Sequence, residues 1–415
     1  MPSRFLPPLL PPPQSWYPGH MTQFSRILPT LLNRTDVVLE LRDARLPLTS
    51  VNKNFEGDIM RTKDGRARHV VDQNSACSSP NMPLPLPRSH ACSVCERVVV
   101  FSKSDLIPEW GIEPFQRAMA AKFPEQKTMF VSSNSPRDLK TLNRLLVNIA
   151  REHSHVPEIN VLVVGMPNVG KSTLLNALRD VGIPGPTPKA LRTSAQPGLT
   201  RALSTRLKLS EDPLVYSFDT PGVMLPFLGR GARGAERGVK LALIAGIKEG
   251  LYDDEALAAY LLYRLNVLNR ADPAYLTLLP AGTMPTDDVH EFLGLLARRL
   301  GMLQRGGVPD LPRAAGWFIR WWRDKGSAAS SRRSGWGLDF EWQADGDAEA
   351  SDTAVQAHME GCIERFVAEE AREEQEGGAV STTQERKRIR ADKLAMRALR
   401  AKSRLVAKRA ARDLA

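Results

Sequence analysis

The stretch "GMPNVGKST", residues 165–173, spaces two glycines, a lysine and a hydroxyl residue between an apolar stretch and a helix-forming one. Glycines let backbone N–H groups curl around phosphate oxygens, and the start of the following helix adds partial positive charge. Lys171 is therefore predicted to reach the β- and γ-phosphates of a nucleotide. Because every fixed position is filled, a phosphate-binding loop is favoured over a plain glycine turn. The predicted phosphate-binding residues are Gly165, Asn168, Val169, Gly170, Lys171, Ser172, Thr173 and, further along, Gly222.

A second motif, "DTPG" at residues 219–222, ends the apolar stretch "LVYSF" 48 residues after Lys171. An acid at a strand tip holds Mg²⁺, usually through water, and the N–H of Gly222 is placed to meet the γ-phosphate. Between the two motifs, "QPGLTRAL" supplies the hydroxyl of Thr200 in a switch segment. The predicted magnesium ligands are Ser172, Thr200 and Asp219, and the predicted catalytic groups are Lys171 and Thr200.

The stretch "FSKSDL", residues 101–106, follows three consecutive valines and has the form of a base-reading loop. The carboxylate of Asp105 would accept from both the ring N–H and the exocyclic amine of guanine, and adenine lacks that donor pair. Such a site rejects an analogue without the group by large factors, so GTP is predicted over ATP. One Lys-x-Asp alone is weak, but a second strand end, "FVSSN", follows it. The predicted guanine-binding residues are Ser102, Lys103, Asp105, Ser132, Ser133 and Asn134.

These loops come in an unusual order, because both base-reading loops precede the phosphate loop. With "WYPGHM" at residues 16–21, "DVVLELRDARLPLTSVN", "GVKLALIAGIKEG" and "GGVPDLPRAAGWFIRWWRDKG", the chain resembles the circularly permuted GTPases over most of residues 16–326. It most resembles the ribosome biogenesis GTPase A family and its mitochondrial ribosome-associated branch. Permutation is tolerable because the strands keep their places in the sheet while termini and connections move.

The resemblance implies a GTPase that assembles the large subunit of the mitochondrial ribosome and couples nucleotide state to rRNA binding. GTP would order the Thr200 and DTPG segments, and hydrolysis would release them. The implied cofactor is Mg²⁺, and Asn168 recurs in related GTPases that use K⁺ as a charge-compensating ion. The implied location is the mitochondrial matrix, with peripheral association at the inner membrane.

Two positions depart from what such enzymes carry. Ser102 stands where the family usually has Asn or Thr, which predicts a weaker base-side or loop-bracing contact. Val223 follows DTPG where Ras-like enzymes have a glutamine that orients the attacking water, and an apolar side chain cannot do this. His20, on the "PGHM" motif, is the polar candidate for that catalytic task near neutral pH. The alternative is that His20 braces the fold or meets RNA.

Alternating strand and helix patterns predict an α/β fold: a circularly permuted P-loop GTPase domain with a doubly wound, mostly parallel sheet. A small all-helical domain and a disordered or helical charged tail follow it. The predicted parts are an N-terminal extension 1–15 that permits targeting, a G domain 16–228 with a disordered insertion 57–96, a helical rRNA-binding domain 229–326, an acidic low-complexity linker 327–383 and a basic tail 384–415.

The insertion contains four residues of types that bind zinc, Cys77, His90, Cys92 and Cys95. One CxxC with an irregular remainder is a weak zinc signal, and translated non-coding sequence is the other explanation. The 4 cysteines of the chain are too few and too uneven for a disulfide framework, which fits a reducing compartment. No apolar run approaches the roughly 18 residues that span a bilayer, so a soluble or peripheral protein is predicted.

The net charge of +11 is unevenly placed. Residues 384–415 hold 12 Lys and Arg against 3 acids, a net +9, whereas residues 339–376 hold 13 acids against 2 Arg, a net −11. This pattern favours a polyanion partner such as nucleic acid, with solubility alone as the alternative. In "WFIRWWRDK", residues 317–325, the tryptophans either stack on unpaired bases or pack inward with the cations outward.

Three rival functions remain open from the sequence. One is the same chemistry on non-mitochondrial pre-ribosomes, whether bacterial, cytosolic or nucleolar. Another is an RNA-binding scaffold that uses GTP only for structure and hydrolyses it negligibly. The last is a P-loop ATPase or small-molecule kinase, which would prefer ATP.

Overall fold

The computed structural model describes most of the first 375 residues. The described residues are 6–14, 16–52, 96–153, 155–185, 188–191, 193, 197–198, 206–269, 271–325, 335–341, 351–375 and 390. Apart from Glu96, the predicted insertion with its zinc candidates lies outside them, as do Thr200 and all but one residue of the predicted basic tail. The chain divides into two compact units, Met1–Val367 and Ala368–Ala415, and among the described residues 368–375 and 390 belong to the second.

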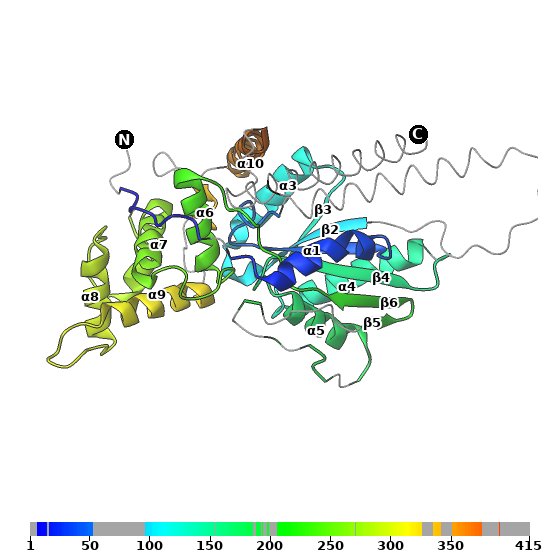
Figure 1. Cartoon of the computed structure of the whole chain (residues 1–415), viewed down its shortest axis with the longest axis horizontal. Coiled ribbons are helices and arrows are strands. Elements are labelled where there is room, and N and C mark those ends of the chain that lie inside the picture. The colour runs from blue at the N-terminus through cyan, green and yellow to red at the C-terminus, as the bar shows by residue number, and fades with distance from the viewer. Residues whose placement is uncertain are drawn as a thin grey trace, which may run out of the picture. The chain divides into compact units, whose positions relative to one another are not determined.

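The core of the first unit is a six-stranded sheet in the order β3-β2-β1-β4-β6-β5 (Figure 1). Only the β5–β6 pair is antiparallel, which confirms the predicted mostly parallel sheet. β1 is buried along its whole length, as expected of a parallel strand covered on both faces. The strands are β1 Val37–Asp43, β2 Glu96–Ser102, β3 Lys127–Val131, β4 Ile159–Gly165, β5 Leu207–Glu211 and β6 Leu214–Asp219.

Helices cover both faces of this sheet. On one face, α4 (Pro136–Glu152) and α5 (Lys171–Gly182) bury their apolar stripes against β1, β2 and β4. On the other face lie α1 (Gly19–Leu32), against β1 and β4, and α3 (Ile112–Lys122), against β2 and β3. Short 3-10 turns, η2 (Ser104–Leu106) and η3 (Glu109–Gly111), lead from β2 into α3. Helix α1 was not predicted, although its Met21, Phe24, Leu28 and Leu32 are all buried.

The register of the parallel strands aligns their carboxyl ends. Asp43 of β1 pairs with Ser102 of β2, and two residues earlier Leu41 pairs with Gly165 of β4. Asp219, the last residue of β6, pairs with Val163 of β4. The loops that follow β1, β2, β4 and β6 therefore meet at one edge of the sheet, where open α/β sheets bind ligands.

A helical region follows β6, as the sequence predicted, although its boundary as a domain stays a prediction. It consists of α6 Gly231–Leu243, α7 Asp254–Leu268, the 3-10 turn η4 Ala274–Leu278, α8 Val289–Arg299 and α9 Leu311–Lys325. α9 packs against both α7 and α8. Trp322 of α9 is fully buried and Trp317 and Trp321 are partly buried, so the inward packing is correct and base stacking by Trp322 is wrong.

The region treated above as an acidic linker contains ordered elements in its described part. β7 (Gly335–Trp336) and β8 (Phe340–Glu341) form a two-stranded sheet, and α10 (Asp352–Gln375) follows. Trp336 is fully buried beside Phe115, with ring centroids 5.2 Å apart, and its indole N–H donates to the Pro108 carbonyl at 2.9 Å. The high acid content of the segment concealed these few apolar residues. Among the described residues, no helix combines the length and apolar character needed to cross a membrane.

Residues 335–341, here called the hairpin, also join the sheet to the helical region. Asp339 accepts hydrogen bonds from the backbone N–H of Leu48 at 3.0 Å and from the N–H and hydroxyl of Thr49 at 2.8 and 2.6 Å. The ammonium group of Lys240, on α6, also donates to Oδ1 of Asp339, at 3.3 Å. The loop after β1 is thereby tied through one carboxylate to α6.

Removal of the Trp336 side chain is predicted to destabilise the first unit strongly. Truncation of a fully buried tryptophan leaves a cavity, so Trp336→Ala should lower the free energy of unfolding by about 3–5 kcal/mol. Urea unfolding followed by circular dichroism measures this. Met284→Ala is the control because Met284 is 77% exposed and should change stability by less than about 0.5 kcal/mol. Equal effects of the two changes would mean that the hairpin does not pack as described.

Candidate nucleotide-binding site

The phosphate loop connects β4 to α5 in a backbone shape that requires glycine at its ends. Gly165 has φ +153°, and a Cβ there would lie 2.4 Å from the backbone oxygen of Leu41. Gly170 has φ +91°, a conformation that other residues adopt only with strain. A Cβ on Gly222 would lie 2.6 Å from the Cα of Pro167, so the DTPG turn packs directly on this loop. The two predicted phosphate-binding motifs therefore lie together.

Lys171 begins α5 and lies inside the loop. Its ammonium group donates to the carbonyl oxygens of Met166 at 2.8 Å and Gly165 at 3.2 Å, and the residue is only 7% exposed. Burial lowers the pKa of Lys171 to about 8, and the Asp219 carboxylate acts in the opposite direction. The lysine is thus charged at neutral pH but close to its titration point.

Ser172 and Asp219 place two oxygen donors side by side. The Ser172 hydroxyl donates to Oδ2 of Asp219 at 2.5 Å, and Asp219 lies at the buried end of β6. Burial raises the pKa of Asp219, while the bond from Ser172 and the charge of Lys171 lower it. A hydroxyl and a carboxylate at the start of a phosphate-binding helix fit Mg²⁺, which prefers a few protein oxygens together with substrate phosphates.

The remaining phosphate-loop residues have different surroundings. Val169 is buried in the core, so only its backbone faces the loop, and Thr173 is exposed on α5. Asn168 has φ +59°, and its side-chain amide donates to the carbonyl oxygen of Ala245 at 2.9 Å. Ala245 lies just after α6, so the phosphate loop contacts the helical region directly.

The base-reading loop that follows β2 contacts the phosphate loop, although the two loops are more than 60 residues apart in the sequence. The ammonium group of Lys103 donates to the carbonyl oxygen of Asn168 at 2.7 Å and to Oδ2 of Asp43 at 3.0 Å. Asp105 is exposed, and its Oδ2 lies 3.5 Å from Nδ2 of Asn134 in the loop after β3. The structure therefore brings both predicted base-reading loops and the phosphate loop to one place.

The serines of these loops brace the backbone. Ser132 is buried, and its hydroxyl accepts from the N–H of Asn134 at 3.2 Å, whereas Ser133 is half-buried. The Ser102 hydroxyl lies within donating distance of the carbonyl oxygens of Val169 at 2.6 Å and Arg42 at 3.1 Å. Ser102 therefore braces the phosphate loop directly, and the expectation of a weaker contact than Asn or Thr would make stays a prediction.

Val223 cannot orient water, because it is 1% exposed beneath α1 in a cluster with Phe24 and Leu28. His20 lies in the first turn of α1. A Cβ on Gly198, in the "QPGLT" segment, would lie 3.7 Å from His20 and 3.4 Å from the ring of Trp16. The N-terminal motif therefore lies beside Gly198, two residues before Thr200 in the sequence, and the role of His20 in catalysis stays a prediction.

Sequence reasoning assigned no role to Asp43 and Arg45, which lie behind Lys103. Asp43 is the last residue of β1 and is fully buried, and Arg45 pairs with it through two hydrogen bonds. The signal that was available is an acid at the carboxyl end of a buried strand, next to the strand that carries the base-reading loop.

A P-loop beside a guanine-type loop that comes earlier in the chain, on a mostly parallel sheet, defines a circularly permuted P-loop GTPase. The sequence profile of the "50S ribosome-binding GTPase" family matches residues 160–267, which begin at the phosphate-loop strand and omit the upstream base-reading loops. "Mitochondrial GTPase 1" of Schizosaccharomyces pombe is 31% identical over 318 residues, covering 72% of this chain and 83% of that protein. The chain belongs to this family of mitochondrial GTPases, which hydrolyse GTP to GDP and phosphate.

Two further comparisons give more distant matches. "Mitochondrial ribosome-associated GTPase 1" of Mus musculus is 29% identical over 256 residues, covering 60% of this chain and 66% of that protein. Among solved structures, GNP-bound YlqF from T. maritima is 20% identical with a TM-score of 0.44, covering 75% of this chain and 98% of that one.

The lowered pKa of Lys171 predicts that GDP binding weakens with rising pH. Phosphate favours the charged lysine, so above pH 8 binding must take up a proton, and affinity should fall by up to about tenfold per pH unit. Titration with fluorescent GDP at pH 7, 8 and 9 measures this. In Lys171→Arg the guanidinium stays charged throughout, so its affinity should be lower but less dependent on pH. Identical pH slopes in the two proteins would contradict the assignment.

Proposed function

We propose that this GTPase is an assembly factor for the large subunit of the mitochondrial ribosome, acting in the matrix and coupling its nucleotide state to rRNA binding. Its relatives support the proposal, since their names place them in mitochondria and associate one group with the ribosome. The family whose profile matches residues 160–267 is described as 50S ribosome-binding.

The observation that best supports coupling between nucleotide state and rRNA binding is a hydrogen bond between the phosphate loop and the helical region. Asn168 donates to Ala245, which adopts φ +57° directly after α6. The DTPG turn is connected to the beginning of α6 through Leu225 and Leu228, which are buried in the same core as α6. A γ-phosphate that reorders DTPG would therefore act on both ends of α6, as in switches that are released on hydrolysis.

Each site residue then has a chemical role. Asp105 would read guanine beneath Lys103, and Asn134 would cap the base from the other side. Mg²⁺, held by Ser172 and by Asp219, would neutralise the phosphate charge that develops in the reaction. Thr200 would join these ligands in the GTP state, and Gly222 would donate its N–H to the γ-phosphate.

Water orientation is assigned to His20, because it lies on α1 beside the Gly198 segment while Val223 is buried. A neutral imidazole is able to hold water by hydrogen bonding near physiological pH. K⁺ is proposed near Asn168, whose side-chain oxygen is the ligand type that K⁺ prefers. We also propose that the protein associates peripherally with the inner membrane.

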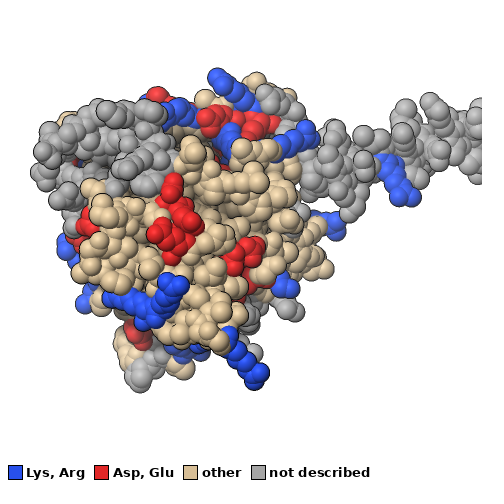
Figure 2. Space-filling model, turned by 90° about the vertical axis from the view of Figure 1, so that its left-hand side faces the viewer, with Lys and Arg blue, Asp and Glu red and all other residues tan. Residues whose placement is uncertain are grey.

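The rRNA-binding surface is assigned to the far end of the helical region. Exposed arginines lie there, and on the face in Figure 2 basic side chains gather in the lower part while acidic ones lie at the centre and, next to basic ones, at the top. The exposed arginines of α8, α9 and the loop between them are Arg298, Arg299, Arg305, Arg313 and Arg320. Such cations meet phosphates without reading sequence, and the net +9 of residues 384–415 would add to this attraction.

The guanine site predicts a change of base specificity in Asp105→Asn. The amide presents a donor in place of one carboxylate acceptor, so GTP affinity should fall by about a hundredfold or more while xanthosine triphosphate gains affinity. Competition of both nucleotides against fluorescent GDP measures this. Glu109→Gln, at an exposed acid of η3 shortly after the same loop, is the control and should keep the preference for GTP. Unchanged GTP affinity in Asp105→Asn would remove Asp105 from the site.

The assembly role predicts nucleotide-dependent binding to large subunits. With a non-hydrolysable GTP analogue the protein should co-sediment with mitochondrial large subunits, and with GDP it should stay in the supernatant. Lys171→Ala is the matched control, because without the phosphate-facing charge both nucleotides should give the same low binding. Equal co-sedimentation of the unaltered protein in both states, or binding to small subunits instead, would contradict the proposed function.

A further inference from the structure

The buried carboxylate of Asp43 is shared between the guanine-reading lysine and an arginine that contacts the helical region. Asp43 is 0% exposed, and such a charge persists in a protein interior only when it is paired and hydrogen-bonded. Arg45 supplies a fork, with Nε donating to Oδ1 at 2.9 Å and Nη2 to Oδ2 at 2.8 Å. Lys103 donates to the same Oδ2 at 3.0 Å. Although burial raises the pKa of Asp43, Arg45 and Lys103 hold it well below its usual range.

On the nucleotide side, Asp43 compensates the charge of Lys103. Burial lowers the pKa of Lys103, and the Asp43 carboxylate acts against that shift. Lys103 itself has φ +59°, a conformation that costs a non-glycine residue energy and needs support from its surroundings. Its ammonium group also donates to Asn168 of the phosphate loop at 2.7 Å. The position of Lys103 therefore depends on two acceptors, and Asp43 is the charged one.

On the other side, Arg45 reaches α9. Its Nη1 donates to the carbonyl oxygen of Arg323 at 3.1 Å, and its guanidinium carbon lies 5.0 Å from the centre of the Trp322 ring. Arg45 is 2% exposed, so these contacts are shielded from water. Its own carbonyl oxygen accepts from the N–H of Leu338 in the hairpin at 2.8 Å.

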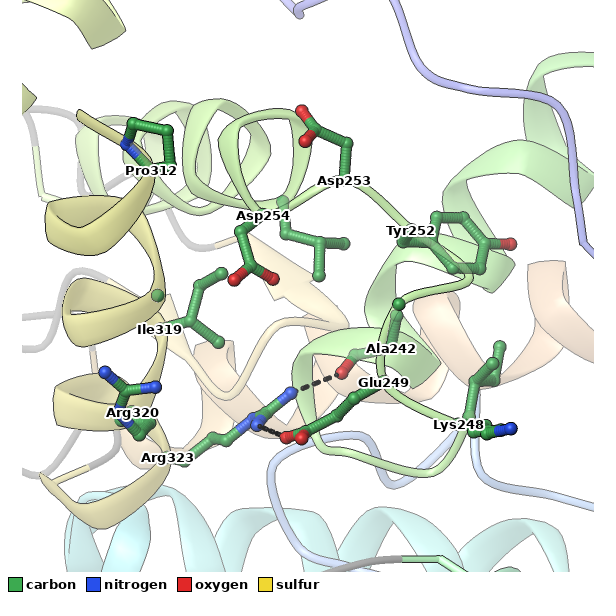
Figure 3. A pocket seen from close by; sticks show the side chains of 14 residues that line it. Ala242, Lys248, Glu249, Tyr252, Asp253, Asp254, Pro312, Ile319, Arg320 and Arg323 are labelled. Atoms are coloured by element: carbon green, nitrogen blue, oxygen red, sulfur yellow. Dashed lines mark hydrogen bonds and ion pairs between the residues drawn. The ribbon is translucent and has the colours of Figure 1, made fainter. Parts of the chain in front are cut away.

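The side chain of Arg323 connects α9 to α6. It donates through Nε to the carbonyl oxygen of Leu243 at 2.8 Å. Through Nη2 it donates to the carbonyl oxygen of Ala242 at 3.0 Å, and it pairs with Glu249 at 3.0 Å (Figure 3). These bonds satisfy the last carbonyls of α6, which a helix leaves unpaired. A cavity of about 510 Å³ lies beside Arg323, between α9 and the loop that follows α6. Two residues after Leu243, Ala245 accepts from Asn168 of the phosphate loop.

These contacts link the guanine-reading loop, through Asp43 and Arg45, to α9, and α9 through α6 to the phosphate loop. The phosphate loop in turn contacts the guanine-reading loop through Lys103. We propose that Asp43 is a positioning residue for guanine recognition: it holds Lys103 over the base, and through Arg45 it makes that position depend on the seating of α9. The inference rests on the proposed function, because it deepens the guanine site assigned there. It provides a route by which a partner bound to the helical region alters nucleotide affinity, and by linkage the reverse also holds.

A double-mutant cycle tests whether Asp43 acts through Lys103. The full-length chain is compared with Asp43→Asn, Lys103→Met and the double variant by titration with fluorescent GDP. Each single change should weaken binding by about tenfold or more, since each removes a charge-assisted hydrogen bond. The double variant should bind no more weakly than Lys103→Met alone. Additive losses would overturn the proposal, because a carboxylate that only supports the fold would cost the same with or without the lysine.

Asp43→Asn leaves the buried Arg45 charged and without its carboxylate partner, which could prevent the protein from folding. A second variant avoids this problem. Asp43→Asn combined with Arg45→Gln neutralises both partners, which is much less costly than breaking a buried pair from one side. This protein should also bind GDP at least about tenfold more weakly, and adding Lys103→Met should cause no further loss. Binding equal to that of the unaltered protein would overturn the proposal.

The α9 link has its own test in GDP release, followed by stopped-flow fluorescence. Trp322→Phe shrinks the ring beneath Arg45 and should speed release severalfold, but it should have no effect in the Asp43→Asn background. Trp317→Phe is the control, since Trp317 lies on the same helix and is partly buried against the same core. Equal effects of the two tryptophan changes, or a Trp322→Phe effect that persists with Asp43→Asn, would overturn the α9 link.

Failure of this inference is distinguishable from failure of the proposed function. If Asp105→Asn does not shift preference toward xanthosine triphosphate, the guanine site itself is misassigned, whatever Asp43 does. If that shift occurs while the losses of Asp43→Asn and Lys103→Met add, the site stands and the positioning role of Asp43 is wrong.

Discussion

The parallel alignment of β1, β2, β4 and β6 is the constraint on which the site depends. Register fixes their carboxyl ends at one edge, and each end carries a residue of the site or its support: Asp43, Ser102, Gly165 and Asp219. The sheet is insensitive to the order in which the chain visits these strands, because each strand pairs only with its neighbours. A permuted chain therefore builds the same nucleotide pocket, with the base-reading loop made before the phosphate loop.

Permutation changes what the nucleotide site is connected to. Here the DTPG turn is followed directly by the helical region, and the loop after β1 contacts both α9 and the hairpin. Beside the shared apolar core, polar contacts also join the two regions, as where the buried Arg45 side chain donates to the carbonyl oxygen of Arg323. Buried polar contacts of this kind are costly when partly broken, so they favour two discrete arrangements over gradual deformation. This property suits a switch.

The charge distribution separates two kinds of recognition. Beside the phosphate loop the charges of Asp43, Lys171 and Asp219 are buried, so salt screens them little. At the end of the helical region the arginines are exposed, and their attraction to phosphate is general and salt-dependent. Both features fit the proposed function, in which the nucleotide is recognised specifically and rRNA through its charge.

The sequence by itself determined the phosphate loop, the DTPG turn, the base-reading loops and their permuted order, because these motifs need particular residue types at short, fixed spacings. It also determined the mostly parallel sheet and the helices after residue 229. It did not reveal α1, whose helical spacing of apolar residues is interrupted by Pro29 and follows a proline-rich stretch. Nor did it reveal α10 or the docking of the hairpin, whose few apolar residues are diluted among acids. Only the tertiary structure decided that Trp322 faces the core, that Ser102 braces the phosphate loop and that Asp43 lies between Lys103 and Arg45. Those contacts join residues far apart in the chain, and strand register and helix packing, which no local pattern encodes, bring them within hydrogen-bonding distance.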